Sequence, residues 1–322
     1  MPCSDETAFR LHAWNWMFLG LSAACFWIGV FVAGLQVTLA GVVYCYGVCC
    51  SLGAFAWWRF RRTAPMRLHT TFVIGSLAQV LLTTVIFAPA TYVAATFSWP
   101  LQDAVLHSFD RALGLEWRAY LDFVNGQPWL GGLLSYGYKM IQWPIFAIPL
   151  VLGLCGHVLR LNQFVLAFAM ALAVTTVVSA FVPAVAAYAH LGLSPADYGN
   201  IRPLADSEHL PDLQQLRAGT FGPLDITQVT GIVTFPSFHA ASCLLYAWAF
   251  WPVRWLRPIT LTANGLMLAA TPIDGGHYFI DVFAGLAVAA AAICSAVLIS
   301  RRLSPSTQAQ VPYGPVLIPG HA

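Results

Sequence analysis

The chain has 322 residues, of which 59% are hydrophobic and 9% are charged, and its formal net charge is +2. A soluble domain carries about 25% charged residues, so a soluble core could not bury this much apolar surface. The composition therefore predicts an integral membrane protein whose main partner is the lipid bilayer, and the small net charge gives no indication of a nucleic-acid partner.

The eight cysteines do not point to a metal site or to a disulfide framework. All but Cys3 lie in or beside apolar runs, and none has the spacing to histidine that metal ligands show. We interpret them as small apolar packing residues. The first apolar run continues without a break beyond Cys25, so we expect an uncleaved membrane helix there rather than a signal peptide.

Apolar runs of about 20 residues, the length that crosses a bilayer, recur along the chain. We expect eight membrane helices, over residues 14–34, 37–58, 70–92, 133–155, 163–187, 237–253, 258–273 and 279–300. The predicted fold is an all-α polytopic membrane helix bundle. We expect an N-terminal helix pair in 1–69, a six-helix catalytic core in 70–302 and a loose tail in 303–322.

Basic residues in short loops mark the cytoplasmic side of a membrane protein. With eight helices, one side receives all the loops that carry Arg59, Arg61, Arg62, Arg67, Arg160, Arg254, Arg257, Arg301 and Arg302. This agreement predicts that both ends of the chain are cytoplasmic, in a plasma or inner membrane. Two long loops, 93–132 and 188–236, then lie on the periplasmic or luminal side, where we expect the active site.

The first motif that carries chemistry is Phe235-Pro236-Ser237-Phe238-His239. Ser237 is a good helix N-cap and an apolar run follows at once, which predicts that His239 lies in the first turn of a helix. Free backbone N–H groups and the helix dipole favour an anion at such a position. A phosphate group is the anion that we expect there.

The second motif is Gly275-Gly276-His277-Tyr278-Phe279-Ile280-Asp281. His277 and Asp281 are four residues apart, so on a helix they would share one face. The carboxylate can accept the proton of one ring nitrogen, which leaves the other nitrogen free to act as a nucleophile. A lone histidine in either motif is often structural, but two motifs on helices that begin on the same predicted side favour a catalytic pair.

These two motifs resemble those of the type-2 phosphatidic acid phosphatase superfamily. The resemblance extends to the branch that contains the inositol phosphorylceramide synthases, through residues 110–117, 216–219 and 231–234. It implies that His277 is the nucleophile that forms a phosphohistidine, that Asp281 orients it and that His239 is the general acid. It also implies a phosphate cradle made by Ser237 and nearby N–H groups, and no metal or other cofactor.

The basic residues that the phosphatase motifs would supply are incomplete in this chain. Thr271 stands where the superfamily has an arginine, six residues before the nucleophile, and Pro195 stands where it has a lysine. We therefore expect other cations to bind the substrate phosphate: Arg217 first, then Lys139 and Arg202.

The predicted activity is that of a lipid phosphatase or phosphotransferase that acts on a lipid phosphate or phosphodiester. Water as the acceptor would make it a phosphatase, and an alcohol would make it a transferase; the sequence leaves this open. The alternative is a lipid-binding or transport protein that retains the fold without activity. A bis-histidine haem protein is a more distant alternative.

Overall fold

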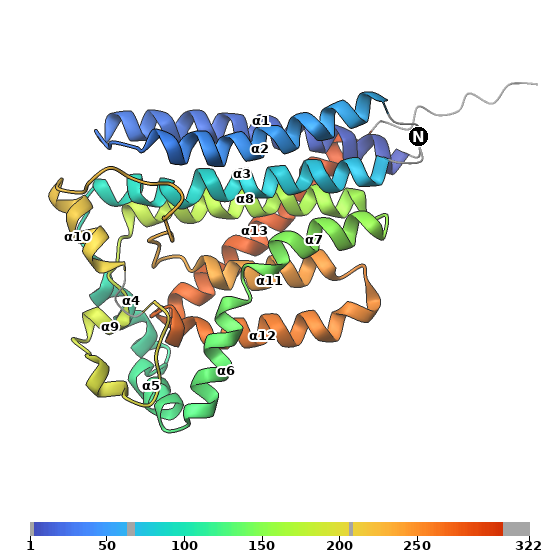
Figure 1. Cartoon of the computed structure of the whole chain (residues 1–322). Helices are drawn as coiled ribbons and strands as arrows, with labels where there is room; N and C mark the ends of the chain where they lie inside the picture. The colour runs from blue at the N-terminus through green and yellow to red at the C-terminus, as the bar shows by residue number, and fades with distance from the viewer. Residues whose placement is uncertain (1–2, 63–67, 206–208, 305–322) are drawn as a thin grey trace, which may run out of the picture.

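The computed structural model describes residues 3–62, 68–205 and 209–304, and 77% of these described residues are helical. The described residues contain no strand, only an isolated bridge between Val37 and Leu224. Most of the predicted tail, 303–322, lies outside the described residues, as does Arg67. The long helices lie side by side and form a bundle (Figure 1).

Each of the eight expected membrane segments corresponds to a helix or to a bent helix pair. Their bounds are α1 (Cys3–Val32), α2 (Leu39–Arg62), α3 (Leu68–Thr96), α6 (Pro128–Lys139) with α7 (Trp143–Leu154), α8 (Val158–Phe181), α11 (Phe238–Phe250), α12 (Arg257–Asp274) and α13 (Phe279–Leu303). Among the described residues, five of these helices are long and apolar enough to cross a membrane, or six if the bent pair is one span. The fold is therefore the expected all-α polytopic bundle.

The fourth expected segment, 133–155, is not one continuous helix. It is broken between α6 and α7, which meet at an angle of 55°. α7 runs with the bundle, whereas α6 turns away from it and packs against α12 (Figure 1). The break brings the last turn of α6 to the side of α11.

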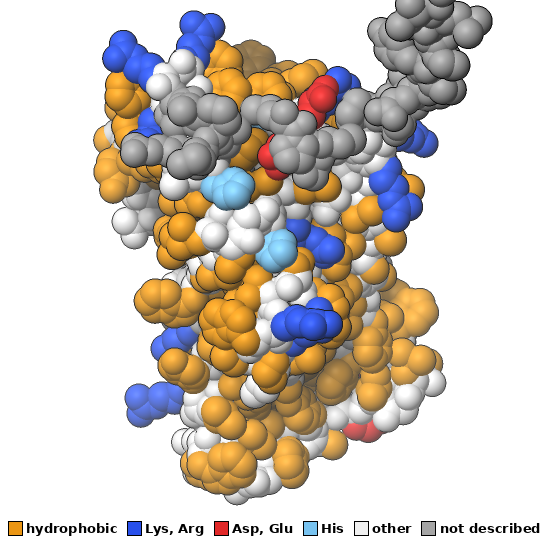
Figure 2. Space-filling view, turned by 90° about the vertical axis from the view of Figure 1, so that its right-hand side faces the viewer, with side chains coloured by type: hydrophobic (Ala, Val, Ile, Leu, Met, Phe, Trp, Pro, Cys, Tyr) orange, Lys and Arg blue, Asp and Glu red, His pale blue; other side chains and the backbone are white. Residues whose placement is uncertain are grey.

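Short helices cover one end of the bundle, on the left in Figure 1. They are α4 (Asp103–Ala112), α5 (Trp117–Asn125), α9 (Ala187–His190), η2 (Pro195–Tyr198) and α10 (Leu210–Ala218). The opposite end receives the connection between α11 and α12, which contains η3 (Arg254–Leu256), and the loops that carry the predicted cytoplasmic arginines. Figure 2 looks onto this end and shows basic side chains spread over it.

The main core lies where α8, α11 and α13 meet α7. Phe164, Phe168, Leu245, Tyr246 and Ala289 are among its fully buried side chains. Small residues let these helices approach closely, as is usual where helices pack in a membrane.

α13 approaches α11 closely at Gly285. A Cβ atom at this position would collide with the carbonyl oxygen of Ser237 and would also touch Ala240. The start of α11 therefore packs against the second turn of α13. The two predicted motifs lie at or just before the starts of these two helices.

Candidate active site

The second motif does not lie wholly on a helix, as the sequence predicted. α13 begins at Phe279, so His277 lies in the turn before the helix and only Asp281 is in its first turn. The two side chains still meet: Nδ1 of His277 is 3.3 Å from Oδ2 of Asp281, and both residues are buried. The same oxygen accepts a hydrogen bond from the Tyr278 N–H at 2.9 Å, which fixes the carboxylate.

This geometry decides which nitrogen of His277 is available for chemistry. An ionised Asp281 holds the proton on Nδ1, because the carboxylate oxygen is an acceptor. Nε2 then carries the free lone pair. His277 also lines the large cavity described below, so a nucleophilic nitrogen can meet a ligand there.

The first motif begins a helix as predicted. Ser237 is the N-cap of α11, and its Oγ accepts a hydrogen bond from the Ala240 N–H at 3.3 Å. The Ser237 N–H donates to the backbone oxygen of Asp281 at 3.0 Å, which ties the starts of α11 and α13 together. His239 follows in the first turn of α11. Its imidazole and that of His277 are close enough to interact electrostatically.

The two histidines line one cavity of about 480 Å³. Its apolar wall comes from α3, α7, α8 and α11 and includes Phe87, Ile145, Phe168 and Leu172. Its polar wall includes the loop 230–234, His209 and the end of α6. A cavity of this size and mixed lining fits a ligand with a polar head and an apolar chain.

Lys139 is the only predicted substrate-binding cation that lines this cavity. It is the last residue of α6, at the break before α7. Its ammonium group lies near the carboxylate of Asp274, which accepts a hydrogen bond from Ser135 at 2.6 Å.

The structure does not bring the other predicted substrate-binding residues to the cavity. Arg217 is on α10, and its guanidinium donates to the backbone oxygens of Trp99 at 3.0 Å and Ser98 at 3.5 Å. Its role there is to hold a loop, so the expectation that it contacts phosphate is not supported. Arg202 is exposed and Ser237 is fully buried, and neither lines the cavity.

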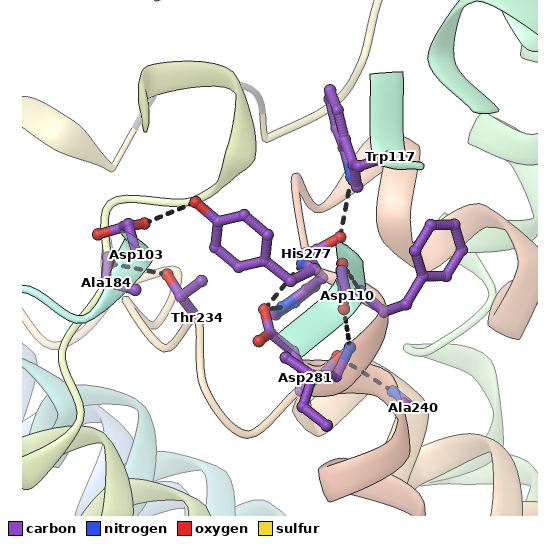
Figure 3. A network of polar contacts seen from close by, with 12 residues as sticks. Asp103, Asp110, Trp117, Ala184, Thr234, Ala240, His277 and Asp281 are labelled. Carbon is purple, nitrogen blue, oxygen red and sulfur yellow. Dashed lines mark hydrogen bonds and ion pairs between the residues drawn. The ribbon is translucent and has the colours of Figure 1, made fainter. Parts of the chain in front are cut away.

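Three residues of the α4–α5 region bind the turn around His277, and none of them was a predicted site residue (Figure 3). The carboxylate of Asp110 accepts hydrogen bonds from the N–H groups of Phe279 and Ile280, both at 2.8 Å. Trp117 donates its indole N–H to the backbone oxygen of His277 at 3.0 Å. Asp103 accepts a hydrogen bond from the Tyr278 hydroxyl at 3.0 Å.

A signal for two of these residues was present in the sequence. Asp110 and Trp117 are the ends of the 110–117 segment that resembles the synthase branch, but the resemblance gives them no contact partner. Burial places all three on the inner faces of amphipathic helices: Asp103, Asp110 and Trp117 are at most 4% exposed. A carboxylate at the start of a helix also interacts favourably with its dipole.

Burial governs the protonation of this network. It raises the pKa of the Tyr278 phenol, and the nearby Asp103 carboxylate raises it further, so the phenol stays protonated and can donate. Burial also raises the pKa of Asp110, against the opposing effect of its two backbone N–H bonds.

One comparison with known proteins gives a match. The sequence model of the PAP2 superfamily matches residues 104–295, which is more than half of the chain and includes both histidine motifs. Neither the curated proteins nor the solved structures gave a match. The chain therefore belongs to the PAP2 superfamily and is an integral membrane enzyme of the phosphatase type.

Proposed function

We propose that the protein transfers the phosphoryl group of a membrane lipid phosphate or phosphodiester through a phosphohistidine on His277. The observation that carries this proposal is that His277 and His239 line one cavity while Asp281 binds Nδ1 of His277. A nucleophile, its orienting group and a second imidazole are the parts that covalent phosphoryl transfer requires.

The reaction has two steps. Nε2 of His277 attacks phosphorus and forms a P–N bond, while the P–O bond to the lipid alcohol breaks and His239 gives its proton to the departing oxygen. An acceptor hydroxyl then attacks phosphorus, its proton passes to His239, and the P–N bond breaks. Water as acceptor gives a phosphatase, and an alcohol gives a transferase.

The lining of the cavity supports a lipid substrate. Its apolar wall faces a polar wall that holds the histidines and Lys139, so an acyl chain and a phosphate have separate places. Lys139 is exposed at the α6–α7 break while it lines the cavity, which favours sideways entry of the lipid at this break. The ammonium group balances charge on the phosphate.

We propose more specifically that the protein acts as a transferase, like the branch that its sequence resembles. The support for this is the α4–α5 region, where Asp110 and Trp117 bind the backbone next to the nucleophile. An inositol phosphorylceramide synthase-like activity would use a lipid or polyol hydroxyl as the acceptor. Identification of the products by mass spectrometry, from a panel of lipid phosphates and phosphodiesters, separates transfer from hydrolysis.

The orientation in the membrane is proposed from the arginines. The loops that carry them lie at one end of the bundle (Figures 1 and 2), and α11 and α13 begin away from that end (Figure 1). We expect that the arginine-bearing end is cytoplasmic and that the site opens to the periplasmic or luminal side. Reporter fusions after Arg62 and within 188–236 should report opposite sides; the same side for both would contradict this topology.

The test of the chemistry is a phosphoryl-release assay on the purified protein in detergent. Wild type should turn over a lipid donor, and His277→Ala should abolish turnover. His157→Ala is the matched control, because His157 lies at the start of α8 and does not line the cavity. Labelled donor should leave a base-stable, acid-labile phosphoryl group on wild type and none on His277→Ala. Full turnover by His277→Ala would refute the mechanism.

A further inference from the structure

Tyr138 stacks on His239 and lines the cavity together with His277, although no motif in the sequence marks it. It is in the last turn of α6, and its ring stacks on the imidazole of His239 with centroids 3.9 Å apart and planes 11° apart. Tyr138, His239 and His277 all line the same cavity.

The hydroxyl group of Tyr138 and the second histidine share Gly275 as a close neighbour. A Cβ atom built on Gly275 would lie 2.8 Å from the Tyr138 hydroxyl oxygen and 2.7 Å from Cδ2 of His277. The Tyr138 hydroxyl oxygen and Cδ2 of His277, the ring carbon bonded to Nε2, therefore both lie close to Gly275 at the cavity. Only a residue without a side chain at position 275 leaves room for this approach.

The position of Tyr138 is fixed from outside the cavity. Three residues earlier on α6, Ser135 donates a hydrogen bond to Asp274 at 2.6 Å, and Asp274 ends α12 just before Gly275. The α6 helix packs along α12. The tyrosine thus belongs to the same rigid unit as the turn that carries His277.

We propose, building on the function proposed above, that Tyr138 serves both histidines: its ring positions His239 for proton transfer, and its hydroxyl donates to the phosphoryl group on His277. A parallel aromatic neighbour restricts rotation of the imidazole and also stabilises its protonated form. The hydroxyl is a neutral donor beside the nucleophile, where charge develops on the phosphoryl oxygens.

The two roles predict different responses to the leaving group. A lipid alcohol must be protonated as it departs, whereas a nitrophenolate departs without a proton. Loss of the ring should therefore add a further loss of rate on an alkyl phosphate only, beyond the effect of losing the hydroxyl. Loss of the hydroxyl alone should slow cleavage of both substrates to the same extent, because both present the same phosphoryl oxygens.

The experiment uses the full-length protein in detergent and compares two phosphate monoesters, phosphatidic acid and a nitrophenyl phosphate whose ring carries a dodecyl chain. It measures the release of the lipid alcohol from the first and of the nitrophenol from the second during the first turnover. Tyr138→Phe should lose about tenfold on both substrates, the effect of one hydrogen bond. Tyr138→Leu should lose a further factor of about 10² on phosphatidic acid only, because the general acid is misplaced. Thermal unfolding checks the fold, and Tyr138→Met replaces Tyr138→Leu if that variant does not fold.

Tyr136 provides the matched control. It is on the same helix, it is 66% exposed and it does not line the cavity, so Tyr136→Phe and Tyr136→Leu should keep wild-type rates. His239→Ala should show the same dependence on the leaving group as Tyr138→Leu.

Each contrary outcome points to a different failure. If the rate loss of His239→Ala depends on the leaving group and that of Tyr138→Leu does not, the proposal for Tyr138 is overturned. The role of His239 as the general acid then stands. If His239→Ala also loses rate equally on both substrates, the general-acid role in the proposed function fails, and the Tyr138 proposal fails with it.

Discussion

Asp110 and Ile280 are joined by a hydrogen bond of 2.8 Å from the backbone N–H of Ile280 to the carboxylate, across 170 residues of chain. The other carboxylate oxygen accepts from the N–H of Phe279. A side chain of α4 therefore caps the first turn of α13, next to the proposed nucleophile.

Replacement of Asp110 should loosen the turn that holds His277. Asp110→Ala leaves two partly buried N–H groups unpaired, and we expect a loss of about 1–3 kcal/mol in the free energy of unfolding, together with lower turnover. Asp110→Asn keeps one acceptor oxygen and should lie between Asp110→Ala and wild type. Chemical denaturation in detergent measures the first effect, and Asp122→Ala is the control, since Asp122 pairs with Arg118 on the exposed face of α5. Equal stability of Asp110→Ala and Asp122→Ala would contradict the role of Asp110.

Asp281→Asn should keep the fold and lose the reaction. An amide oxygen in the place of Oδ2 can still accept from the Tyr278 N–H and from Nδ1 of His277, but the neutral amide no longer stabilises the positive charge that the imidazole gains when it attacks phosphorus. We expect kcat to fall by at least about 10²-fold, with KM changed little. Steady-state kinetics on a lipid phosphate measures this, and a fall in affinity without a fall in kcat would argue against an orienting role.

The structure reverses the order in which the sequence ranked Arg217 and Lys139 as phosphate-binding cations. Lys139→Met keeps the length of the side chain and removes the charge that faces the cavity, so kcat/KM should fall by about 10–10²-fold. Arg217→Ala should change turnover by less than about twofold, because its guanidinium binds the backbone of Ser98 and Trp99 outside the cavity. A large loss of turnover in Arg217→Ala with Lys139→Met unaffected would reverse the assignment of the phosphate-binding cation.

Gly275 and Gly265 form a matched pair near α12. A methyl group at Gly275 would crowd His277, the Tyr138 hydroxyl and the backbone oxygen of Thr271, whereas one at Gly265 meets nothing within 4 Å. Gly275→Ala should therefore reduce turnover strongly. Gly265→Ala should keep wild-type turnover and gain up to about 1 kcal/mol from its better helix propensity. Similar turnover in the two variants would mean that the close approach at Gly275 is not needed.

The sequence by itself determined the features that depend on neighbouring residues. Apolar runs of membrane length indicated the helices. The loops that carry the arginines were expected on one side, and they lie at one end of the bundle. The N-cap at Ser237 and the interacting pair His277 and Asp281 were also predictable, because each involves residues within one helical turn. The family could be inferred from the same two short motifs.

Only the tertiary structure decided which distant residues surround these motifs. Asp103, Asp110 and Trp117 meet the His277 turn across 160 or more residues, and Tyr138 reaches His239 because α6 bends away from α7. Periodicity and spacing report which face of a helix is apolar, but not which helix packs against it. The choice of Lys139 over Arg217 at the cavity has the same origin, since a basic residue in a loop has no sequence signal for the direction of its side chain.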